Sequence, residues 1–178
     1  MADFFEVAAA RESCRDYTDT PVTKEELAGL AEAARLSPSA CNSQPWHFVA
    51  VYTPDICQKV AACTQSMGMN KFASKAPAFL VVLEGEGNLS AKMGGKIKHQ
   101  DYTSVDIGIA AAHIVLAAKA SRLDTCILGW FEEDKLREVL SLAKGRRIRL
   151  VICVGHGKGG TPRVKQRRPL EDILEFRE

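Results

Sequence analysis

The chain has 178 residues, of which 46% are hydrophobic and 26% are charged. This is the composition of an ordinary globular domain, and the length predicts a single domain over residues 1–178. The formal net charge of +2 at pH 7 excludes a protein that binds nucleic acid through its overall charge.

The first elements in chain order are predicted to be two helices. A helix is expected from Asp3 to Glu12, with one face on the core, because its apolar residues have helical spacing. Thr23 and Glu26 form a capping box, which predicts a second helix from Lys24 to Arg35. Pro38 then prevents that helix from continuing.

The middle of the chain is predicted to contain two strands and a helix between them. The strands are expected at Trp46–Tyr52 and Ala78–Leu83, and the helix at Pro54–Thr64. The next segment, Glu84–Asp101, is rich in glycine, lysine and small polar residues that break any period. It is therefore expected to be a mobile surface segment or lid.

The most apolar element is a predicted helix from Ser104 to Ala120. It is hydrophobic on nearly every face, and such a helix must be buried on every face. Its length and its interruption by Asp106, His113 and Lys119 argue against a membrane span, so no membrane partner is expected. Complete burial is difficult in a small domain, so the helix is expected at a homodimer interface.

Three elements and a tail complete the chain. A strand is expected at Thr125–Leu128, a surface helix at Glu132–Leu142 and a last core strand at Arg147–Val154. The tail is poor in apolar residues except for four near its end. A tail that wraps onto a partner subunit would bury these four: Leu170, Ile173, Leu174 and Phe176.

Residue spacing excludes several kinds of chemistry. The six cysteines form no Cys-x-x-Cys pair and no histidines stand at ligand spacing, so no zinc or iron–sulfur site is expected. The four histidines form no convincing triad with a serine or cysteine. No signal peptide is recognisable, so a cytoplasmic location with free thiols is expected.

The basic stretch from 144 to 168 contains nine Lys and Arg residues and no acidic residue. A nucleic-acid-binding arm is not expected there, because the stretch includes the apolar run Leu150–Val154 and lacks aromatic residues for base stacking. It also includes Gly155–Gly160, which fits Gly-x-Gly-x-x-Gly. Thr161 and Pro162 follow this motif where a dinucleotide fold needs a helix, so a flexible turn is expected.

Two basic motifs near the chain ends suit the same kind of ligand. Arg11, Ser13 and Arg15 follow the first helix, and Lys165 and Arg167 lie near the end of the chain. Their guanidinium, ammonium and hydroxyl groups are the donors that a phosphate or an anionic ring needs. The arginines would also suit a helix C-terminus, and Lys165 and Arg167 could belong to a solvated basic tail, so residue types leave these alternatives open.

A third motif runs from Ser37 to Trp46 and contains Pro-Ser-x-x-Asn-x-Gln-Pro-Trp, whose prolines argue against a helix. Together with Arg-x-Ser-x-Arg, the small-residue helix and Lys-x-Arg-x-Pro, it resembles the FMN-dependent nitroreductase family. The order of elements matches along nearly the whole chain. Two positions depart from the pattern, namely Glu12, where the family often has a basic residue, and Asp124, where its Gly-Leu-Gly turn has glycine.

The resemblance implies an α+β, nitroreductase-like three-layer fold, with a mainly antiparallel central sheet flanked by helices, in a domain-swapped homodimer. It also implies an FMN site shared between subunits. One subunit would supply the Pro38–Asn42 loop, and the other would supply the groups that meet the phosphate, the ring edge and the ring face. The implied cofactor-binding residues are Arg11, Ser13, Arg15, Pro38, Ser39, Asn42, Asn70, Leu128, Gly129, Lys165 and Arg167.

The activity implied by the resemblance is electron transfer from NADH or NADPH to a nitroaromatic, quinone or flavin acceptor by a ping-pong mechanism. The cofactor carries the chemistry, so no catalytic residue is expected among the side chains. Two alternatives keep the same FMN residues. One is a specialised flavin enzyme of the dehalogenase or azoline oxidase type, and the other is a non-catalytic FMN-binding protein.

Overall fold

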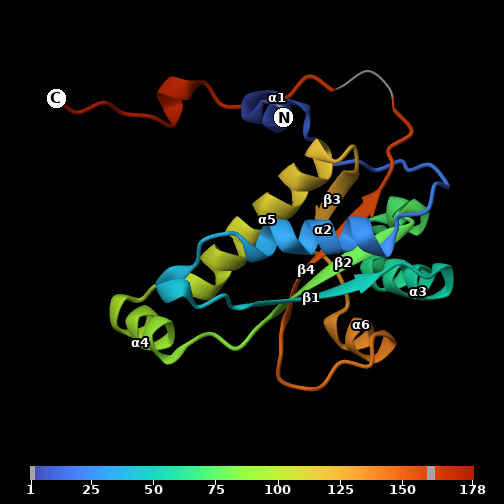
Figure 1. The fold of residues 1–178 in the computed structure, drawn as a ribbon, viewed down its shortest axis with the longest axis horizontal. Coiled ribbons are helices and arrows are strands. Elements are labelled where there is room, and N and C mark those ends of the chain that lie inside the picture. Colours follow the sequence, from blue (N-terminus) through green and yellow to red (C-terminus); the bar gives the residue numbers. More distant parts are fainter. Residues whose placement is uncertain (1–2, 160–162) are drawn as a thin grey trace.

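The structure is a computed structural model that describes residues 3–159 and 163–178. A four-stranded antiparallel sheet forms its centre, with the strand order β1-β2-β4-β3 (Figure 1). The helices and strands are α1 (Phe4–Ala10), α2 (Lys24–Arg35), β1 (Trp46–Val51), α3 (Pro54–Thr64), β2 (Ala78–Glu84), α4 (Leu89–Lys98), α5 (Tyr102–Ala120), β3 (Asp124–Leu128), α6 (Glu133–Val139) and β4 (Ile148–Gly155). Short 3₁₀ turns are η1 (Ala40–Asn42), η2 (Ser66–Gly68), η3 (Lys71–Lys75) and η4 (Leu170–Asp172).

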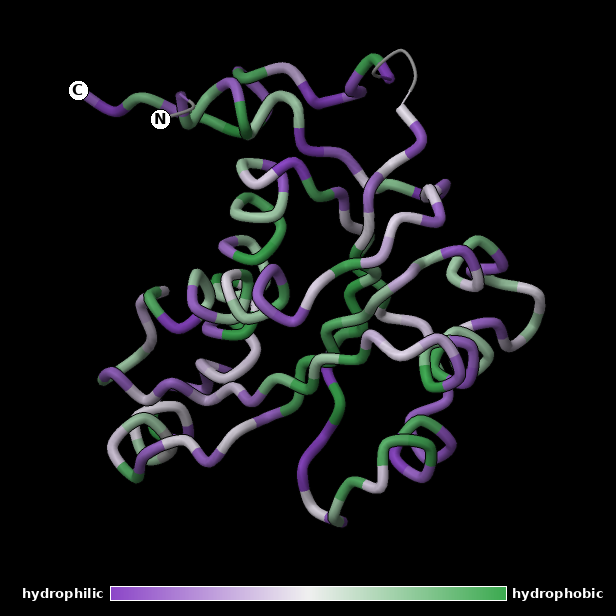
Figure 2. Tube along the Cα trace, turned by 45° about the vertical axis from the view of Figure 1, so that its right-hand side comes forward, coloured by the Kyte–Doolittle hydropathy of each residue, from purple (hydrophilic) through white to green (hydrophobic). Residues whose placement is uncertain are grey.

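Helices cover both faces of the sheet, which makes three layers. Alternate residues of a strand point to opposite faces, so β2 contributes to two cores. Phe79 and Val81 pack with buried residues of α3 and α6, whereas Leu80 and Val82 pack with those of α2 and α5. The hydrophobic residues are concentrated along the strands (Figure 2). The α+β, three-layer fold with an antiparallel sheet is therefore confirmed.

Helix α2 begins and ends where its sequence predicts. The Thr23 Oγ1 accepts a hydrogen bond from the Glu26 N–H at 3.1 Å, and the Glu26 carboxylate accepts one from the Thr23 N–H at 2.8 Å. This reciprocal pair satisfies two N–H groups at the helix start. Leu27 and Leu30 are then buried against the sheet and α5.

Helix α5 packs one side against α2 and the sheet and leaves the other side partly open. Ile107, Ala110 and Ile114 are buried, whereas Val105 is 55% exposed. By length and composition α5 could cross a membrane, with a mean hydropathy of 1.3, so the argument against a span from length and interruption was wrong. Core helices pass the same test, and the packing of α5 on the sheet is that of a core helix.

Three local predictions were wrong. The segment Glu84–Asp101, expected to be irregular, contains α4, which starts where the Asn88 side chain accepts a hydrogen bond from the Ala91 N–H at 2.9 Å. The loop after α2 contains the single turn η1 despite its prolines. Helix α1, expected to pack on the core, has no buried residue, and its Phe5 is 78% exposed.

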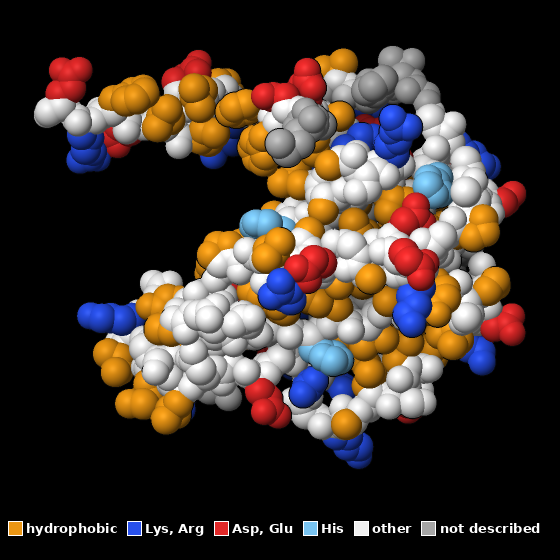
Figure 3. Space-filling view, in the orientation of Figure 1, with side chains coloured by type: hydrophobic (Ala, Val, Ile, Leu, Met, Phe, Trp, Pro, Cys, Tyr) orange, Lys and Arg blue, Asp and Glu red, His pale blue; other side chains and the backbone are white. Residues whose placement is uncertain are grey.

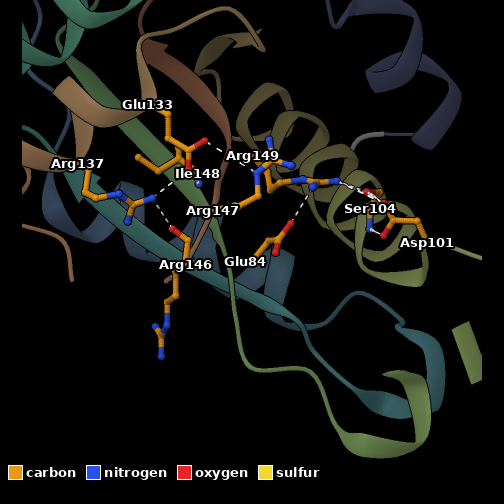
Figure 4. A network of polar contacts seen from close by, with 9 residues as sticks. All are labelled: Glu84, Asp101, Ser104, Glu133, Arg137, Arg146, Arg147, Ile148 and Arg149. Carbon is orange, nitrogen blue, oxygen red and sulfur yellow. Dashed lines mark hydrogen bonds and ion pairs between the residues drawn. The ribbon is translucent and has the colours of Figure 1, made fainter. Parts of the chain in front are cut away.

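Ion pairs at one end of the sheet fix the start of α5 (Figure 4). The Arg149 guanidinium on β4 pairs with Glu84 on β2 at 2.7 Å, and it also contacts Ser104 in the first turn of α5. Beside it, the Glu133 carboxylate on α6 accepts a hydrogen bond from the Ile148 N–H on β4 at 2.9 Å. These contacts tie α5 and α6 to the sheet.

The C-terminal segment leaves the body of the molecule as an arm beside α1, with an open space beneath it (Figure 3). Its apolar side chains are exposed: Leu170 64%, Ile173 64%, Leu174 43% and Phe176 84%. Within this chain the tail therefore does not bury the side chains that were expected to need burial.

Candidate functional site

The two basic motifs meet in space although more than 150 residues separate them. The Lys165 ammonium donates to the Ala8 carbonyl at 2.8 Å, and the Arg163 guanidinium donates to the Ser13 carbonyl at 2.7 Å. A cavity of about 330 Å³ lies between the two segments. Its lining includes Arg11, Glu12, Ser13, Arg15, Arg163, Lys165 and Arg167. Five of the predicted site residues are thus brought together.

The charges around this cavity are unbalanced. Five cationic side chains face it, and Glu12 is the one carboxylate in its lining. Glu12 already pairs with Arg163 at 3.2 Å. Partial burial, together with the nearby charges of Arg11 and Arg167, lowers the pKa of Lys165. An anion in the cavity would relieve this repulsion, so the cavity suits a phosphate.

Pairing with β3 holds the first basic motif in place. The Cys14 N–H donates to the Thr125 carbonyl at 2.9 Å, and Ser13 forms a parallel bridge with Thr125. Tyr17, which is 1% exposed, donates its hydroxyl to the Cys14 carbonyl at 2.9 Å. The segment before and after Ser13 is therefore fixed to the sheet, and a rigid support of this kind presents side chains in a defined geometry.

From Arg15 the site extends along η3 to the turn after β3. The Arg15 guanidinium lies 5.7 Å from the centre of the Phe72 ring, a cation–π distance. Asn70, just before η3, donates its amide to the Thr64 carbonyl at 3.2 Å and to the Trp130 carbonyl at 3.3 Å. These contacts place the predicted residues Asn70, Leu128 and Gly129 in one neighbourhood. Leu128 has a buried side chain, so its backbone is the part available to a ligand.

Gly129 faces open space. A Cβ atom built on it would meet nothing within 4 Å among the described residues, so packing inside this chain does not require glycine there. A ligand that approaches the backbone closely would require it.

The predicted residues Pro38, Ser39 and Asn42 lie at the other end of α5. Ala40 bonds to Asp106 near the start of that helix, whereas Lys119, near its end, lines a second cavity of about 390 Å³ beside Ser13 and Arg15. Thirteen helical residues separate Asp106 from Lys119, which corresponds to about 20 Å. The loop after α2 and the segment after α1 lie at opposite ends of α5 (Figure 1). One chain therefore does not bring the Pro38–Asn42 loop to the basic cavity.

The loop itself is well ordered by internal bonds. The Ser39 hydroxyl accepts a hydrogen bond from the Gln44 N–H at 2.9 Å, and the side-chain Oδ1 of Asn42 accepts one from the Gln44 side-chain amide at 3.1 Å. The Ser39 proton and the Asn42 NH₂ group are left as donors for a ligand.

Sequence reasoning missed three residues of the site. Arg163 lines both cavities, and Phe72 lies beneath Arg15. Asp124, known only as a departure from the family pattern, accepts from the Lys119 ammonium at 2.9 Å and from the Gly157 N–H at 3.2 Å. The basic run containing Arg163 was a visible signal, but only the fold shows its partner Glu12.

The Gly155–Gly160 motif belongs to a tight contact. Gly160 lies outside the described residues, and residues 163–169, where the description resumes, form no helix. A Cβ on Gly157 would come within 2.8 Å of the Asp124 carboxylate and 3.2 Å of the Cys14 sulfur. This glycine is needed for close packing, and a dinucleotide-binding helix is not present in the described part of the chain.

The cysteines near the site are weak nucleophiles. Burial raises the pKa of both Cys14 and Cys126, and the Cys14 thiol donates to the Asp16 carbonyl at 3.1 Å. Both are therefore protonated at neutral pH. Across residues 3–159 and 163–178, no three His, Cys, Asp or Glu side chains are grouped as metal ligands.

Comparison with known proteins identifies the family. The model of the nitroreductase family matches residues 8–66 and 59–156, which is most of the chain, so the chain belongs to the nitroreductase family. Family membership supports an NAD(P)H oxidoreductase enzyme. The matched residues end before Lys165 and Arg167.

Individual relatives agree with this assignment. The putative NAD(P)H nitroreductase YodC of Bacillus subtilis is 24% identical, with 97% of this chain and 98% of the relative covered. An oxygen-insensitive NADPH nitroreductase of Helicobacter acinonychis is 30% identical, with 74% and 76% covered. A nitroreductase family protein of Streptococcus pneumoniae has the same fold, with a TM-score of 0.82, 24% identity and coverage of 98% and 100%. An FMN-dependent nitroreductase of Clostridium difficile gives a TM-score of 0.78 with 21% identity, covering 98% of this chain and 99% of that one.

Proposed function

We propose that this protein is a homodimeric flavoprotein that binds FMN and passes electrons from NADH or NADPH to a nitroaromatic, a quinone or a free flavin. The observation that carries the proposal is the convergence of Arg11, Ser13, Lys165 and Arg167 on one cavity in a member of the nitroreductase family. Three cations and a hydroxyl are a suitable donor set for the phosphate of FMN. A fold relative is itself an FMN-dependent nitroreductase.

The remaining residues fit the rest of an FMN molecule. Arg15 would meet the pyrimidine edge of the ring, Asn70 its polar edge, and the Leu128–Gly129 backbone its face. When bound, FMN supplies the two-electron redox chemistry. The protein supplies binding and orientation, which is why no activated nucleophile is needed beside the site.

Arg15 tunes the redox potential in this proposal. A fixed guanidinium at the pyrimidine edge favours the negative charge that the ring gains on reduction. The Phe72 ring packs against the Arg15 guanidinium and helps to orient it. Glu12 would oppose this effect, but its carboxylate pairs with Arg163, which reduces its influence.

The homodimer is proposed because one chain separates the two halves of the site. The Pro38–Asn42 loop lies about 20 Å along α5 from the basic cavity, so a second copy would bring its loop to this cavity. The exposed apolar side chains of the arm, such as Ile173 and Phe176, would be buried by the same partner. Light scattering should then give twice the chain mass of 19.5 kDa. A monomeric mass at micromolar concentration would contradict the shared site.

Steady-state kinetics test the ping-pong mechanism. Donor and acceptor would occupy the same space in turn, so double-reciprocal plots at several acceptor concentrations should be parallel for NADH or NADPH. Intersecting lines would show that both bind together and would contradict the mechanism. FMN binding without NAD(P)H consumption would point to a carrier or to a more specialised flavin enzyme.

A further inference from the structure

Asp106 is a buried carboxylate that reaches across the fold to the Pro38–Asn42 loop. It lies in α5, is 3% exposed, and accepts a hydrogen bond from the Ala40 N–H at 3.0 Å. Among the described residues, its second oxygen is buried and has no hydrogen-bond partner. Burying a carboxylate with so little solvation costs free energy, and the hydrogen bond from Ala40 is the main contact that offsets this cost.

The bond to Ala40 is not part of the normal capping of α5. That task belongs to Asp101, whose carboxylate accepts from the Ser104 N–H at 3.0 Å. Asp106 lies inside the helix, where an acidic residue does not satisfy the free N–H groups of the first turn. The hydrogen bond of Asp106 therefore restrains the Pro38–Asn42 loop and does not cap α5.

The loop needs outside support because its backbone is strained. Cys41, Asn42 and Gln44 have φ angles of 52°, 50° and 48°, in the left-handed region that favours glycine. Such conformations persist only where the surroundings determine them. Asp106 restrains the loop before these residues, at Ala40.

A second tether holds the loop from the side of α4. The Asn88 side-chain amide donates to the Cys41 carbonyl at 2.8 Å, and the Asn88 N–H donates to the Ser43 hydroxyl at 2.9 Å. The loop is therefore held between α4 and α5. Asp106 is the tether that comes from a buried side chain.

We infer that Asp106 is a positioning residue for FMN: its bond to Ala40 fixes the loop so that the Ser39 hydroxyl and the Asn42 NH₂ group are presented to the flavin of the partner subunit. This inference rests on the proposed function. A preorganised loop loses less conformational freedom when the ligand binds, so the bond strengthens FMN binding without touching FMN.

The test is FMN titration of the full-length apoprotein, followed by flavin fluorescence, for three single variants and the wild type. Asp106→Leu removes the acceptor of the Ala40 N–H and should weaken binding about tenfold or more, as expected when a partly buried N–H loses its partner. Asp106→Asn keeps an oxygen for the Ala40 N–H and should recover most of the affinity. Asp101→Asn is the matched control at the start of the same helix and should bind FMN as the wild type does.

A variant of the loop tests the same hydrogen bond by removing its donor, the Ala40 N–H. Ala40→Pro removes the N–H at the first position of a helical turn, where proline is tolerated. Ala40→Pro should weaken FMN binding by about as much as Asp106→Leu does. It provides the measurement of this hydrogen bond if the Asp106→Leu protein does not fold. The double variant should bind FMN about as weakly as either single variant, because both changes remove the same hydrogen bond.

The outcomes separate this inference from the function on which it rests. A wild type that does not bind FMN would overturn both. A wild type that binds FMN, with unchanged affinity in folded Asp106→Leu or Ala40→Pro protein, would overturn the positioning role alone. Equal losses in Asp106→Leu and Asp101→Asn would show a general effect of α5 stability and would overturn it as well.

Discussion

Replacing Arg11 by alanine is expected to weaken FMN binding by about 10- to 150-fold while the fold is retained. In the described part of the chain the Arg11 side chain makes no hydrogen bond or ion pair, so its removal breaks no polar contact there. A charge-assisted hydrogen bond contributes about 1.5–3 kcal/mol, and each 1.4 kcal/mol is about tenfold in affinity. The stability of the apoprotein should stay the same or rise, because Arg11 helps to lower the pKa of Lys165 by repulsion.

Arg168→Ala is the matched control for this prediction. Arg168 is one residue from Arg167, but its guanidinium donates to the Asp172 carbonyl at 2.9 Å and does not line the cavity. The assay is calorimetric titration of each apoprotein with FMN, together with thermal unfolding without ligand. Unchanged affinity in Arg11→Ala, or an equal loss in Arg168→Ala, would refute the phosphate contact at this cavity.

Three further predictions follow from the structure. Because the pKa of Lys165 is lowered, FMN affinity should fall as pH rises through that pKa, earlier than for an ordinary lysine; Lys165→Arg, titrated across the same alkaline range, should lack this step. Gly157→Ala should disturb the packing of Asp124 and Cys14 and lower the melting temperature by several degrees, as read by thermal unfolding; an unchanged value would show that the contact relaxes freely. Leu30→Ala should reduce the free energy of unfolding by about 2–5 kcal/mol in urea, and a loss below about 1 kcal/mol would contradict its placement in the core.

Local signals in the sequence predicted much of the fold. The capping box at Thr23 and Glu26 and the proline at the start of α3 predicted where two helices begin, because N-caps and N-terminal prolines act within the first helical turn. Helix α4 was missed because its two glycines lower helix propensity. The Asn88 cap and contacts with η1 and α5 offset this weakness, and these contacts depend on tertiary structure.

The sequence predicted the residue types of the candidate site and a shared ligand for its two basic motifs, but not the contacts that join the motifs. The Arg-x-Ser-x-Arg and Lys-x-Arg-x-Pro motifs indicated an anion site, and the structure places both at one cavity. The pair between Glu12 and Arg163 joins residues 151 positions apart, and Asp106 reaches Ala40 across 66 positions. No local pattern indicates such contacts, because they depend on how the strands and helices pack.

The most direct test of the proposed function is the visible spectrum of the purified protein, with the released chromophore identified by chromatography and the bound chromophore reduced by NADH or NADPH without oxygen. A yellow protein that releases FMN, one per chain, and bleaches rapidly with the reduced nicotinamide is the predicted result. A colourless protein that also fails to take up added FMN would contradict the assignment of the basic cavity and of the redox function.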